Sequence, residues 1–358
     1  MSRFFSERHR ELIAYTPGEQ PGEKKYIKLN TNESPFPPSL KARERMKEVL
    51  GGLNLYSDPE CRVLREKLAE KQGVNSDMVI AGNGSDEVLN IIFMAFCDEK
   101  NPAVFPDITY GFYPVFANVN GVPYKEIPLD EKLRIRIEDY KPAGGTAFIA
   151  NPNAHTGIML ARKEIEEILR ANRDNIVVID EAYADFSGES CIPLVHDYDN
   201  LIVVRTFSKS CSLAGARLGF AIACEELVAD MNTIRYSLNP YNVNTVTMAA
   251  GIGTLEDYEY IKNACETIVK TRKRITDRLK ELGFSMTDSE ANFVFAACDR
   301  MDGGELYEKL KDRGILVRHF PKERICKYNR ITIGSDEDMD VLIETMEEIL
   351  KEEKNENC

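Results

Sequence analysis

The sequence predicts an α/β protein in which a three-layer large domain with a mostly parallel sheet is joined to a smaller α+β domain. From about residue 78 onward, short apolar runs rich in β-branched residues alternate with longer amphipathic stretches, which is typical of a layered α/β domain. Most of these runs show no alternation of apolar and polar residues, as expected of strands buried on both faces. After residue 244 the pattern becomes mainly helical with a few short strands, which indicates a second unit.

The elements of the large domain follow in order along the chain. The first forty residues contain five prolines and should form an extended arm rather than a packed element. We expect buried strands at Met78–Ala81, Ala103–Phe105, Thr146–Ala150, Ile176–Asp180, Leu201–Thr206 and Gly219–Ala223. Between them, amphipathic patterns predict helices such as Ser85–Phe96 and Lys163–Asn172.

The second unit begins with a nearly continuous helical pattern over Leu255–Leu282, which is long enough, at about 1.5 Å per residue, to bridge two domains. Beyond it we expect strands at Phe293–Ala296, Ile315–Val317 and Ile331–Ile333, and helices at Gly303–Arg313 and Glu337–Lys351. We therefore place an N-terminal arm at residues 1–35, which joins the small domain, a large domain at 36–260 and a small C-terminal domain at 261–358.

Composition excludes several classes of protein. The 358 residues include 46 Lys and Arg against 59 Asp and Glu, a net charge of −13, which argues against a nucleic-acid binder. No apolar run approaches the ~20 residues of a membrane span, and the N-terminus lacks the apolar segment of a signal peptide. The nine cysteines form no Cys-x-x-Cys pair, and the four histidines are dispersed. We therefore expect a reduced, cytoplasmic protein with no metal site.

Asp180 and Lys209 are the first candidate functional residues, since Asp180 ends one predicted buried strand and Lys209 lies just past the end of another. Parallel strands direct their carboxyl ends toward a ligand crevice. Burial would raise the pKa of Asp180 and neutralise its carboxyl group unless a cationic or hydrogen-bond-donating partner is near. The alternative to a functional role is that this residue caps a helix. Lys209 lies among small residues, and as an imine-forming nucleophile it would need a pKa lowered to about 8. A cationic neighbour such as Arg217 could contribute to that shift, whereas the alternative is a surface loop lysine.

A possible anion site precedes the predicted helix at Ser85–Phe96. Gly84, Ser85 and Asp86 place free backbone N–H groups and a hydroxyl at the start of this helix, where anions bind favourably. Simple N-capping is the alternative. Tyr110 and Tyr113 could pack in the core or cover a flat ring.

These motifs together resemble one family. Ser208–Lys209–Ser210 followed by Leu213–Gly219 resembles the lysine signature of pyridoxal-phosphate aminotransferases of the aspartate aminotransferase fold type. Two further segments resemble that family's Asp-x-x-Tyr motif and its Asn-Pro-x-x-Pro-Thr-Gly loop: Asp180–Tyr183 and Asn151–Gly157. More narrowly, several segments look like histidinol-phosphate aminotransferases: Leu29–Pro35, Gly82–Glu87, Ala291–Phe293, Gly314–Arg318 and Arg330–Gly334. The likeness spans nearly the whole chain in the right order.

The resemblance implies fold type I of the pyridoxal-phosphate-dependent transferases, with pyridoxal 5′-phosphate as cofactor, and it assigns three catalytic residues. Lys209 would bind the cofactor covalently and move a proton, Asp180 would pair with its pyridine nitrogen, and Tyr183 would donate to its ring oxygen. The other cofactor-binding residues implied are Gly84, Ser85, Asp86, Tyr110, Asn153, Ser208, Arg217 and, across a homodimer interface, Tyr56 of the partner subunit. Tyr15, Arg318 and Arg330 are implied to bind the substrate.

The loop at residues 151–157 departs from the family pattern. It reads Asn-Pro-Asn-Ala-His-Thr-Gly, with Ala154 where asparagine usually contacts the ring oxygen and His155 where proline usually stands. Either Asn153 reaches the ring instead, or Tyr183 holds the ring oxygen alone. We expect His155 to be a loop residue rather than a catalyst.

The resemblance implies a cytoplasmic homodimer that converts L-histidinol phosphate and 2-oxoglutarate to imidazole acetol phosphate and L-glutamate, a step of histidine biosynthesis, by a ping-pong cycle. Its partners would be a small phosphorylated amine and a 2-oxo acid. Threonine-phosphate decarboxylase is the alternative on the same fold, but its N-terminal segment resembles Asn-x-Asn-Pro rather than the Asn32–Pro35 segment found here. A broad aromatic or acidic amino-acid aminotransferase comes third. A non-catalytic binding protein would be favoured only if Lys209 were absent.

Overall fold

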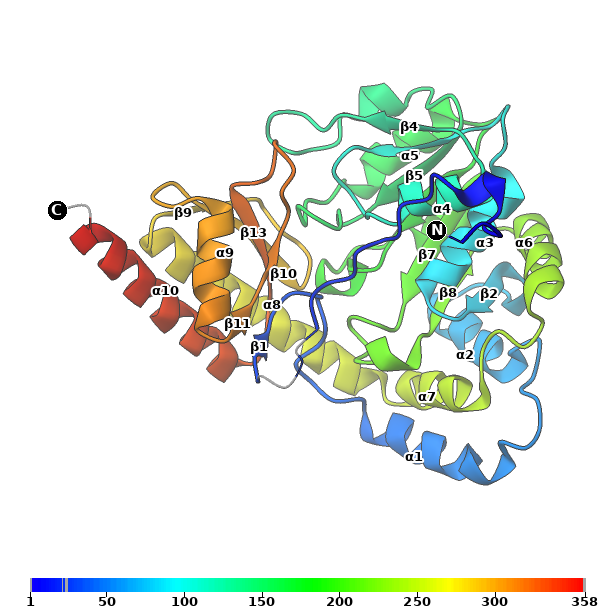
Figure 1. Cartoon of the computed structure of the whole chain (residues 1–358). Helices are drawn as coiled ribbons and strands as arrows, with labels where there is room; N and C mark the ends of the chain where they lie inside the picture. The colour runs from blue at the N-terminus through cyan, green and yellow to red at the C-terminus, as the bar shows by residue number, and fades with distance from the viewer. Residues whose placement is uncertain (1, 21, 23–24, 357–358) are drawn as a thin grey trace.

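A computed structural model describes residues 2–20, 22 and 25–356 of the chain. Its larger part is a layered α/β assembly, and its smaller part, on the left of Figure 1, carries a second sheet and the C-terminal helix. The N-terminal arm runs between the two parts.

The large sheet contains seven strands within the described residues, in the order β2-β8-β7-β6-β5-β3-β4. Their bounds are β2 Val79–Gly82, β3 Ala103–Pro106, β4 Tyr124–Ile127, β5 Thr146–Ala150, β6 Val177–Asp180, β7 Leu201–Thr206 and β8 Gly219–Ile222. Strands β4, β3, β5, β6 and β7 are parallel to one another, and β8 runs antiparallel to both β2 and β7. The predicted mostly parallel sheet is therefore confirmed.

Helices cover both faces of this sheet, which gives the predicted three layers. They are α1 Leu40–Val49, α2 Arg62–Gln72, α3 Ser85–Phe96, α4 Tyr113–Asn120, α5 Arg162–Ala171, α6 Glu225–Leu238 and α7 Thr245–Glu256. Alternate residues of one strand enter different cores: Val177 and Ile179 belong to the core that includes α5, whereas Val178 packs with α3 and α4. Apart from β4 at the sheet edge, the strands lack a polar face because neither face meets water.

The predicted continuous helix over Leu255–Leu282 is wrong at its start. The chain leaves helical geometry at Asp257 (φ −124°, ψ 41°), which separates α7 from α8 (Tyr258–Glu281). A Cβ added at Gly253 in α7 would lie 2.6 Å from the Lys41 carbonyl oxygen of α1. The close packing of α7 on α1 fixes the direction of α7, so the chain must turn before α8.

The small sheet has the order β12-β13-β10-β9 in the described part of the chain, and all its pairs are antiparallel. Its strands are β9 Phe284–Met286, β10 Phe293–Cys298, β12 Arg318–His319 and β13 Tyr328–Thr332, and α9 Gly303–Asp312 and α10 Asp336–Glu356 pack nearby. On the arm, β1 (Ile27–Lys28) pairs in parallel with β11 (Ile315–Leu316). The structure thus ties the arm to the C-terminal part, although residues 1, 21, 23–24 and 357–358 of the proposed domains lie outside the described residues.

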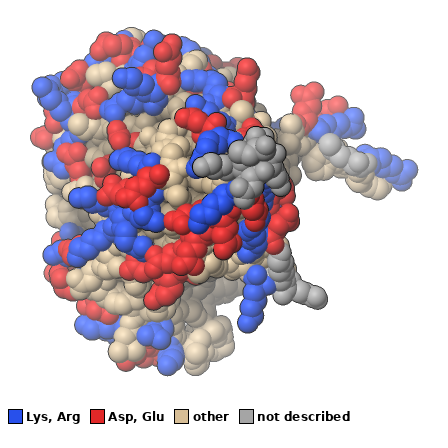
Figure 2. Space-filling model, turned by 90° about the vertical axis from the view of Figure 1, so that its left-hand side faces the viewer, with Lys and Arg blue, Asp and Glu red and all other residues tan. Residues whose placement is uncertain are grey.

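Acidic and basic side chains are interleaved on the face formed by the small domain, as Figure 2 shows. Several of them join α8 and α9 to α10 through ion pairs, including Arg274 with Asp336, Arg278 with Glu347 and Arg313 with Glu352. Such exposed pairs contribute little singly. No helix among the described residues is both long and apolar enough to span a membrane.

Candidate active site

A pocket of about 330 Å³ lies at the carboxyl ends of the central parallel strands, where ligands bind in open α/β sheets. Strand β6 ends at Asp180, and β7 ends three residues before Lys209. Eight residues predicted from the sequence line this pocket: Ser85, Asp86, Tyr110, Asp180, Tyr183, Ser208, Lys209 and Arg217. Residues as far apart in the sequence as Ser85 and Arg217 thus meet here, as the strand-end reasoning required.

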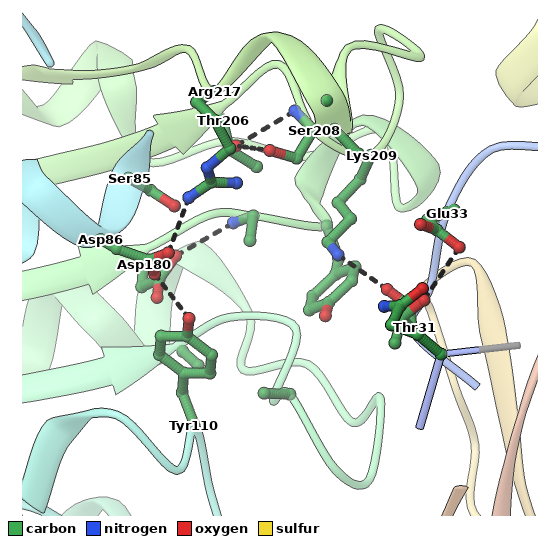
Figure 3. Close-up of a pocket in the computed structure, with 17 residues that line it drawn as sticks. Thr31, Glu33, Ser85, Asp86, Tyr110, Asp180, Thr206, Ser208, Lys209 and Arg217 are labelled. Atoms are coloured by element: carbon green, nitrogen blue, oxygen red, sulfur yellow. Dashed lines mark hydrogen bonds and ion pairs between the residues drawn. The ribbon is translucent and has the colours of Figure 1, made fainter. Parts of the chain in front are cut away.

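Lys209 extends across the pocket, away from the group formed by Ser85, Asp86 and Arg217 (Figure 3). Its Nζ donates to the carbonyl oxygen of Thr31 at 3.0 Å. Burial, and next the positive charge of Arg330, lower the pKa of Lys209 from 10.5 to about 8. The free amine is therefore roughly 300-fold more abundant at pH 7 than in an ordinary lysine. Arg217, the cationic neighbour suggested from the sequence, is a smaller cause than either.

Asp180 is a buried carboxyl with no cationic partner among the described residues. Its Oδ2 accepts a hydrogen bond from the Tyr113 hydroxyl at 2.9 Å, and its Oδ1 accepts from the Ala182 N–H at 3.2 Å. Burial raises its pKa from 3.8 to about 6 despite these two donors. A buried carboxylate normally has a cation beside it, so this geometry fits a ligand that brings a protonated nitrogen.

A network behind the pocket fixes the chain on both sides of the site. Arg205 of β7 binds Glu181 at 3.0 Å and also binds Asp185, and all three side chains are buried or nearly so. Asp185 accepts in addition from the Ser210 hydroxyl. Because Glu181 follows Asp180 and Ser210 follows Lys209, this network holds the backbone of both candidate catalytic residues.

The other end of the pocket is built to hold an anion. Helix α3 begins at Ser85, directly after Gly84, which has a φ of 84°. A Cβ at Gly84 would lie 2.4 Å from Arg217 Nη2, and one at Gly219 would lie 2.2 Å from the Ser85 backbone nitrogen. These glycines let the arginine and the free N–H groups of α3 approach the same space, where an anion is favoured.

Asp86 orients two side chains at this anion-binding end. It accepts from Arg217 Nη2 at 2.8 Å and from the Tyr110 hydroxyl at 2.5 Å, as drawn in Figure 3. On the neighbouring loop, Thr206 Oγ1 donates to Ser208 Oγ at 3.0 Å and accepts from the Ser208 N–H at 3.1 Å. The serine hydroxyl is thereby held at the pocket wall, with its own hydrogen left free for a ligand.

Tyr183 lies at the side of the pocket nearest the arm. Its hydroxyl accepts a hydrogen bond from Asn32 Nδ2 at 2.9 Å, and its ring meets Phe293 edge-on at 5.3 Å between centroids. Asn32 was not predicted as a site residue, although it belongs to the Leu29–Pro35 motif. The pocket also includes Thr31 and Glu33 of this segment, which the motif could have indicated.

Arg318 and Arg330 face each other across the antiparallel pair of β12 and β13. Like charges in directly opposed positions destabilise a sheet unless an anion compensates them. Arg330 Nη1 donates to the Ala154 carbonyl oxygen at 2.8 Å, and its buried Nε has no partner in the described part of the chain. Arg318 reaches the backbone of the arm at Thr16 and Pro17. The pair is thus available to bind an anion, beside rather than in the wall of the pocket.

Three other positions discussed from the sequence, Tyr15, Asn153 and His155, have different surroundings. Tyr15 packs against Phe112 with 4.3 Å between ring centroids. Asn153 does not line the pocket, because its Nδ2 is engaged by the Ile108 carbonyl oxygen at 2.9 Å and Ala154 takes the lining position. His155 is buried with its ring 4.2 Å from that of Phe320.

Tyr56 lies away from the pocket of its own chain. It is 82% exposed and stacks on Tyr241. Its predicted contact concerns the pocket of the partner subunit, so this single chain leaves it a prediction. Tyr113, for which a core position was one of the two alternatives from the sequence, is buried in the core and donates from its hydroxyl to Asp180.

Comparisons with known proteins agree with this site. A sequence model of the family "Aminotransferase class I and II" matches residues 24–346. The chain is 46% identical over 353 residues to the histidinol-phosphate aminotransferase of Brachyspira hyodysenteriae, covering 98% of this chain and 100% of the relative. It is 45% identical over 350 residues to the enzyme of the same name from Acinetobacter baumannii, covering 97% of each.

Among solved structures, a similar fold is that of histidinol-phosphate aminotransferase from Sinorhizobium meliloti, which was determined in complex with pyridoxal-5′-phosphate. The TM-score is 0.88 at 24% identity, over 98% of this chain and 99% of that chain. This likeness confirms the predicted fold class. Together with the family match over most of the sequence, it places the chain in the class I and II aminotransferase family.

Proposed function

We propose that the protein is a histidinol-phosphate aminotransferase that exchanges an amino group between L-histidinol phosphate and 2-oxoglutarate, yielding imidazole acetol phosphate and L-glutamate. The observation that carries this proposal is the grouping in one pocket of a lysine with a pKa of about 8, a buried carboxyl without a cation and an arginine-bearing anion site. Relatives that are 43–46% identical over nearly the whole chain carry that name.

The residues present fit pyridoxal 5′-phosphate as the cofactor. Ser85, Ser208, Arg217 and the N-terminus of α3 would hold its phosphate, and the orphaned carboxyl of Asp180 would pair with its protonated ring nitrogen. When bound, this cofactor supplies an aldehyde that condenses with amines and a ring that withdraws electrons. The bond of Tyr110 to Asp86 holds its ring at the wall of the pocket, where it could cover the cofactor ring.

The chain's own groups then divide the chemistry between them. Lys209 holds its Nζ in the pocket with a lowered pKa, so it can act as a nucleophile and can later carry the proton from the substrate Cα. Asp180 would hold a proton on the ring nitrogen by its negative charge. Tyr183 would donate to the ring oxygen, since Ala154 offers no donor there.

Both half-reactions use one substrate pocket. Histidinol phosphate carries a phosphate, whereas glutamate and 2-oxoglutarate carry carboxylates. Arg330 and Arg318 present planar guanidinium groups that can bind either anion with two hydrogen bonds, which a lysine could not do. Tyr15, at the edge of the arm, would help to close this pocket.

A two-substrate assay tests this function directly. Purified protein with pyridoxal phosphate should form glutamate from 2-oxoglutarate when L-histidinol phosphate is the donor, and O-phospho-L-threonine should release no carbon dioxide. Borohydride treatment followed by peptide mapping should place the cofactor on Lys209. A label on another lysine, or no reaction with any phosphorylated amine, contradicts the assignment; in the second case a general amino-acid aminotransferase is the better description.

We also propose a homodimer in which Tyr56 binds the cofactor phosphate of the partner subunit. This is supported by the exposure of Tyr56 and of the neighbouring apolar side chains Leu50, Leu53 and Leu55, each more than half exposed in the single chain. Sedimentation should give twice the mass of one chain. A fully active monomer would contradict the shared site. The cytoplasmic location stays a prediction.

A further inference from the structure

Asn32 has an unusual position on the arm. Its backbone lies in the left-handed region with a φ of 56°, its side chain is buried, and its main-chain oxygen accepts from Asn292 Nδ2 at 3.0 Å. Few residues other than glycine adopt this conformation, and asparagine is one of them. This backbone conformation therefore places the Asn32 side chain against Tyr183, 151 positions away in the sequence.

The hydrogen bonds around Asn32 have a fixed direction. The Asn32 N–H donates to Thr332 Oγ1 at 2.9 Å, and Thr332 Oγ1 donates in turn to Asn32 Oδ1 at 3.1 Å. The amide oxygen is thus occupied by the threonine, and the amide nitrogen faces Tyr183. The Tyr183 hydroxyl must accept from this nitrogen, because an NH₂ group only donates.

Exchanging the amide oxygen and nitrogen of Asn32 would break this arrangement. Thr332 Oγ1 would then face two donors, the backbone N–H and the side-chain NH₂, and no other acceptor for its hydrogen is recorded among the described residues. A buried hydroxyl without an acceptor is unfavourable. In the arrangement found, the Asn32 backbone N–H, the Thr332 hydroxyl and one amide N–H of Asn32 each have an acceptor, and the Tyr183 proton remains for the pocket.

We propose that Asn32 is a positioning residue that turns the phenolic proton of Tyr183 into the pocket, toward the ring oxygen of the cofactor. This inference rests on the proposed function. It explains how the site works with Ala154 at the pocket wall, where no side-chain donor is available. The Tyr183 oxygen already accepts a hydrogen bond from the Asn32 amide. Its proton is therefore free to point to the ring oxygen, and this one donor is enough.

The charged groups near Tyr183 do not determine the direction in which its hydroxyl proton points. Burial raises the pKa of Tyr183, Arg330 and the Asn32 bond lower it, and Asp180 raises it. The phenol therefore stays protonated at neutral pH. Of the neighbouring groups, the Asn32 amide is the one that contacts its oxygen at hydrogen-bond distance in the described structure.

A double-mutant cycle on the cofactor-loaded protein tests the role of Asn32. The readout is the midpoint pH at which the visible absorption of the lysine-bound cofactor changes, because a donor to the ring oxygen lowers this midpoint. Asn32→Asp keeps the shape of the side chain and tolerates the left-handed backbone, but its carboxylate accepts the Tyr183 proton. We expect the midpoint to rise by about 1–2 pH units.

Two further variants separate positioning from charge. In the Tyr183→Phe background, Asn32→Asp should move the midpoint by less than half as much, because the proton it redirects is absent. Asn30→Asp is the matched charge control: Asn30 is equally buried on the same arm, but its Nδ2 binds the Glu19 carbonyl oxygen. Equal shifts of Asn32→Asp with and without the Tyr183 hydroxyl would overturn the proposal, as would an equal shift for Asn30→Asp.

A milder variant applies if Asn32→Asp does not fold. Thr332→Val removes the hydroxyl that orients the Asn32 amide and preserves the shape of the side chain. It should raise the midpoint by a few tenths of a pH unit when Tyr183 is present and leave it unchanged in the Tyr183→Phe background. No change in either background would refute the role of the amide. A protein that shows no cofactor band on Lys209 would instead refute the proposed function.

Discussion

Replacing Asp180 by asparagine should stabilise the cofactor-free protein and abolish turnover. Burial raises the pKa of this carboxyl from 3.8 to about 6. A carboxyl whose pKa is higher in the folded chain holds its proton more tightly when folded, so its contribution to stability is lost as the pH rises from about 3.8 to about 6. The difference of about 2 pH units corresponds to about 3 kcal/mol of unfolding free energy.

Asparagine can contact both groups that now face the carboxyl. Its Oδ1 can accept from the Ala182 N–H, and its Nδ2 can donate to the Tyr113 oxygen, since a phenol both donates and accepts. The substitution therefore removes the buried charge, but the Tyr113 hydroxyl loses its acceptor, which costs about 1 kcal/mol. At pH 7.5 the variant should be more stable than the unmodified protein by up to about 2 kcal/mol, and this gain should be lost near pH 4.

Urea unfolding of the cofactor-free protein, followed by circular dichroism between pH 4 and pH 8, measures this difference. Asp174→Asn is the matched control, since it removes the same charge from an exposed position and should change the stability by less than about 0.5 kcal/mol. A variant at position 180 that is no more stable at pH 7.5, or whose gain does not vary with pH, would refute the assignment of a buried, uncompensated charge. Normal turnover after addition of cofactor would refute the catalytic role.

The remaining predictions concern Lys209, the pair Arg318 and Arg330, and the anion-binding end of the pocket. Competitive acetylation of the cofactor-free protein with acetic anhydride should give a midpoint near pH 8 for Lys209, and a midpoint above pH 10 would exclude an activated amine. Arg330→Lys should lower kcat/KM for both half-reactions by roughly 30- to 1000-fold, with the cofactor spectrum unchanged. Arg318→Ala should impair single turnovers with histidinol phosphate more than those with glutamate, and equal effects would contradict its contact with the phosphate. Gly219→Ala should weaken cofactor binding in a fluorescence titration, because its Cβ would displace the start of α3, whereas Gly22→Ala, whose Cβ would meet no atom of the described residues within 4 Å, should not.

The sequence predicted the inner strands of the large sheet well, because burial on both faces leaves a plain apolar signal. Strands β5 and β7 have the expected bounds. Strand β4 was missed, since Tyr124, Lys125 and Glu126 are exposed at the sheet edge and read as a loop. The break at Asp257 was missed for another reason, because it depends on how closely α7 packs against α1, which no local pattern records.

The site was predictable where a residue follows a strand end or belongs to a compact motif, as Asp180, Lys209 and Arg217 do. It was less predictable where function depends on a contact between distant segments. The bond from Asn32 to Tyr183 and the bond from Tyr113 to Asp180 join residues 151 and 67 positions apart. Asn153 shows the opposite error: its sequence position suggested a ligand contact, but the Ile108 carbonyl engages its amide.

Two buried charges at the site have no partner of opposite charge in the described part of the chain, and this indicates which charges the ligand must carry. The carboxyl of Asp180 has no cation, and the guanidinium of Arg330 has no acidic partner in the part of the chain that the structure describes. Each buried charge lowers the stability of the protein on its own, so both are explained only if a bound molecule compensates them. That molecule must place a protonated nitrogen at Asp180 and anionic groups at Arg330 and Arg217. Between these ends lies the lysine with its lowered pKa, for which an aldehyde is the matching reactant. A cofactor joined to an anionic substrate meets all these conditions, and neither component meets them alone.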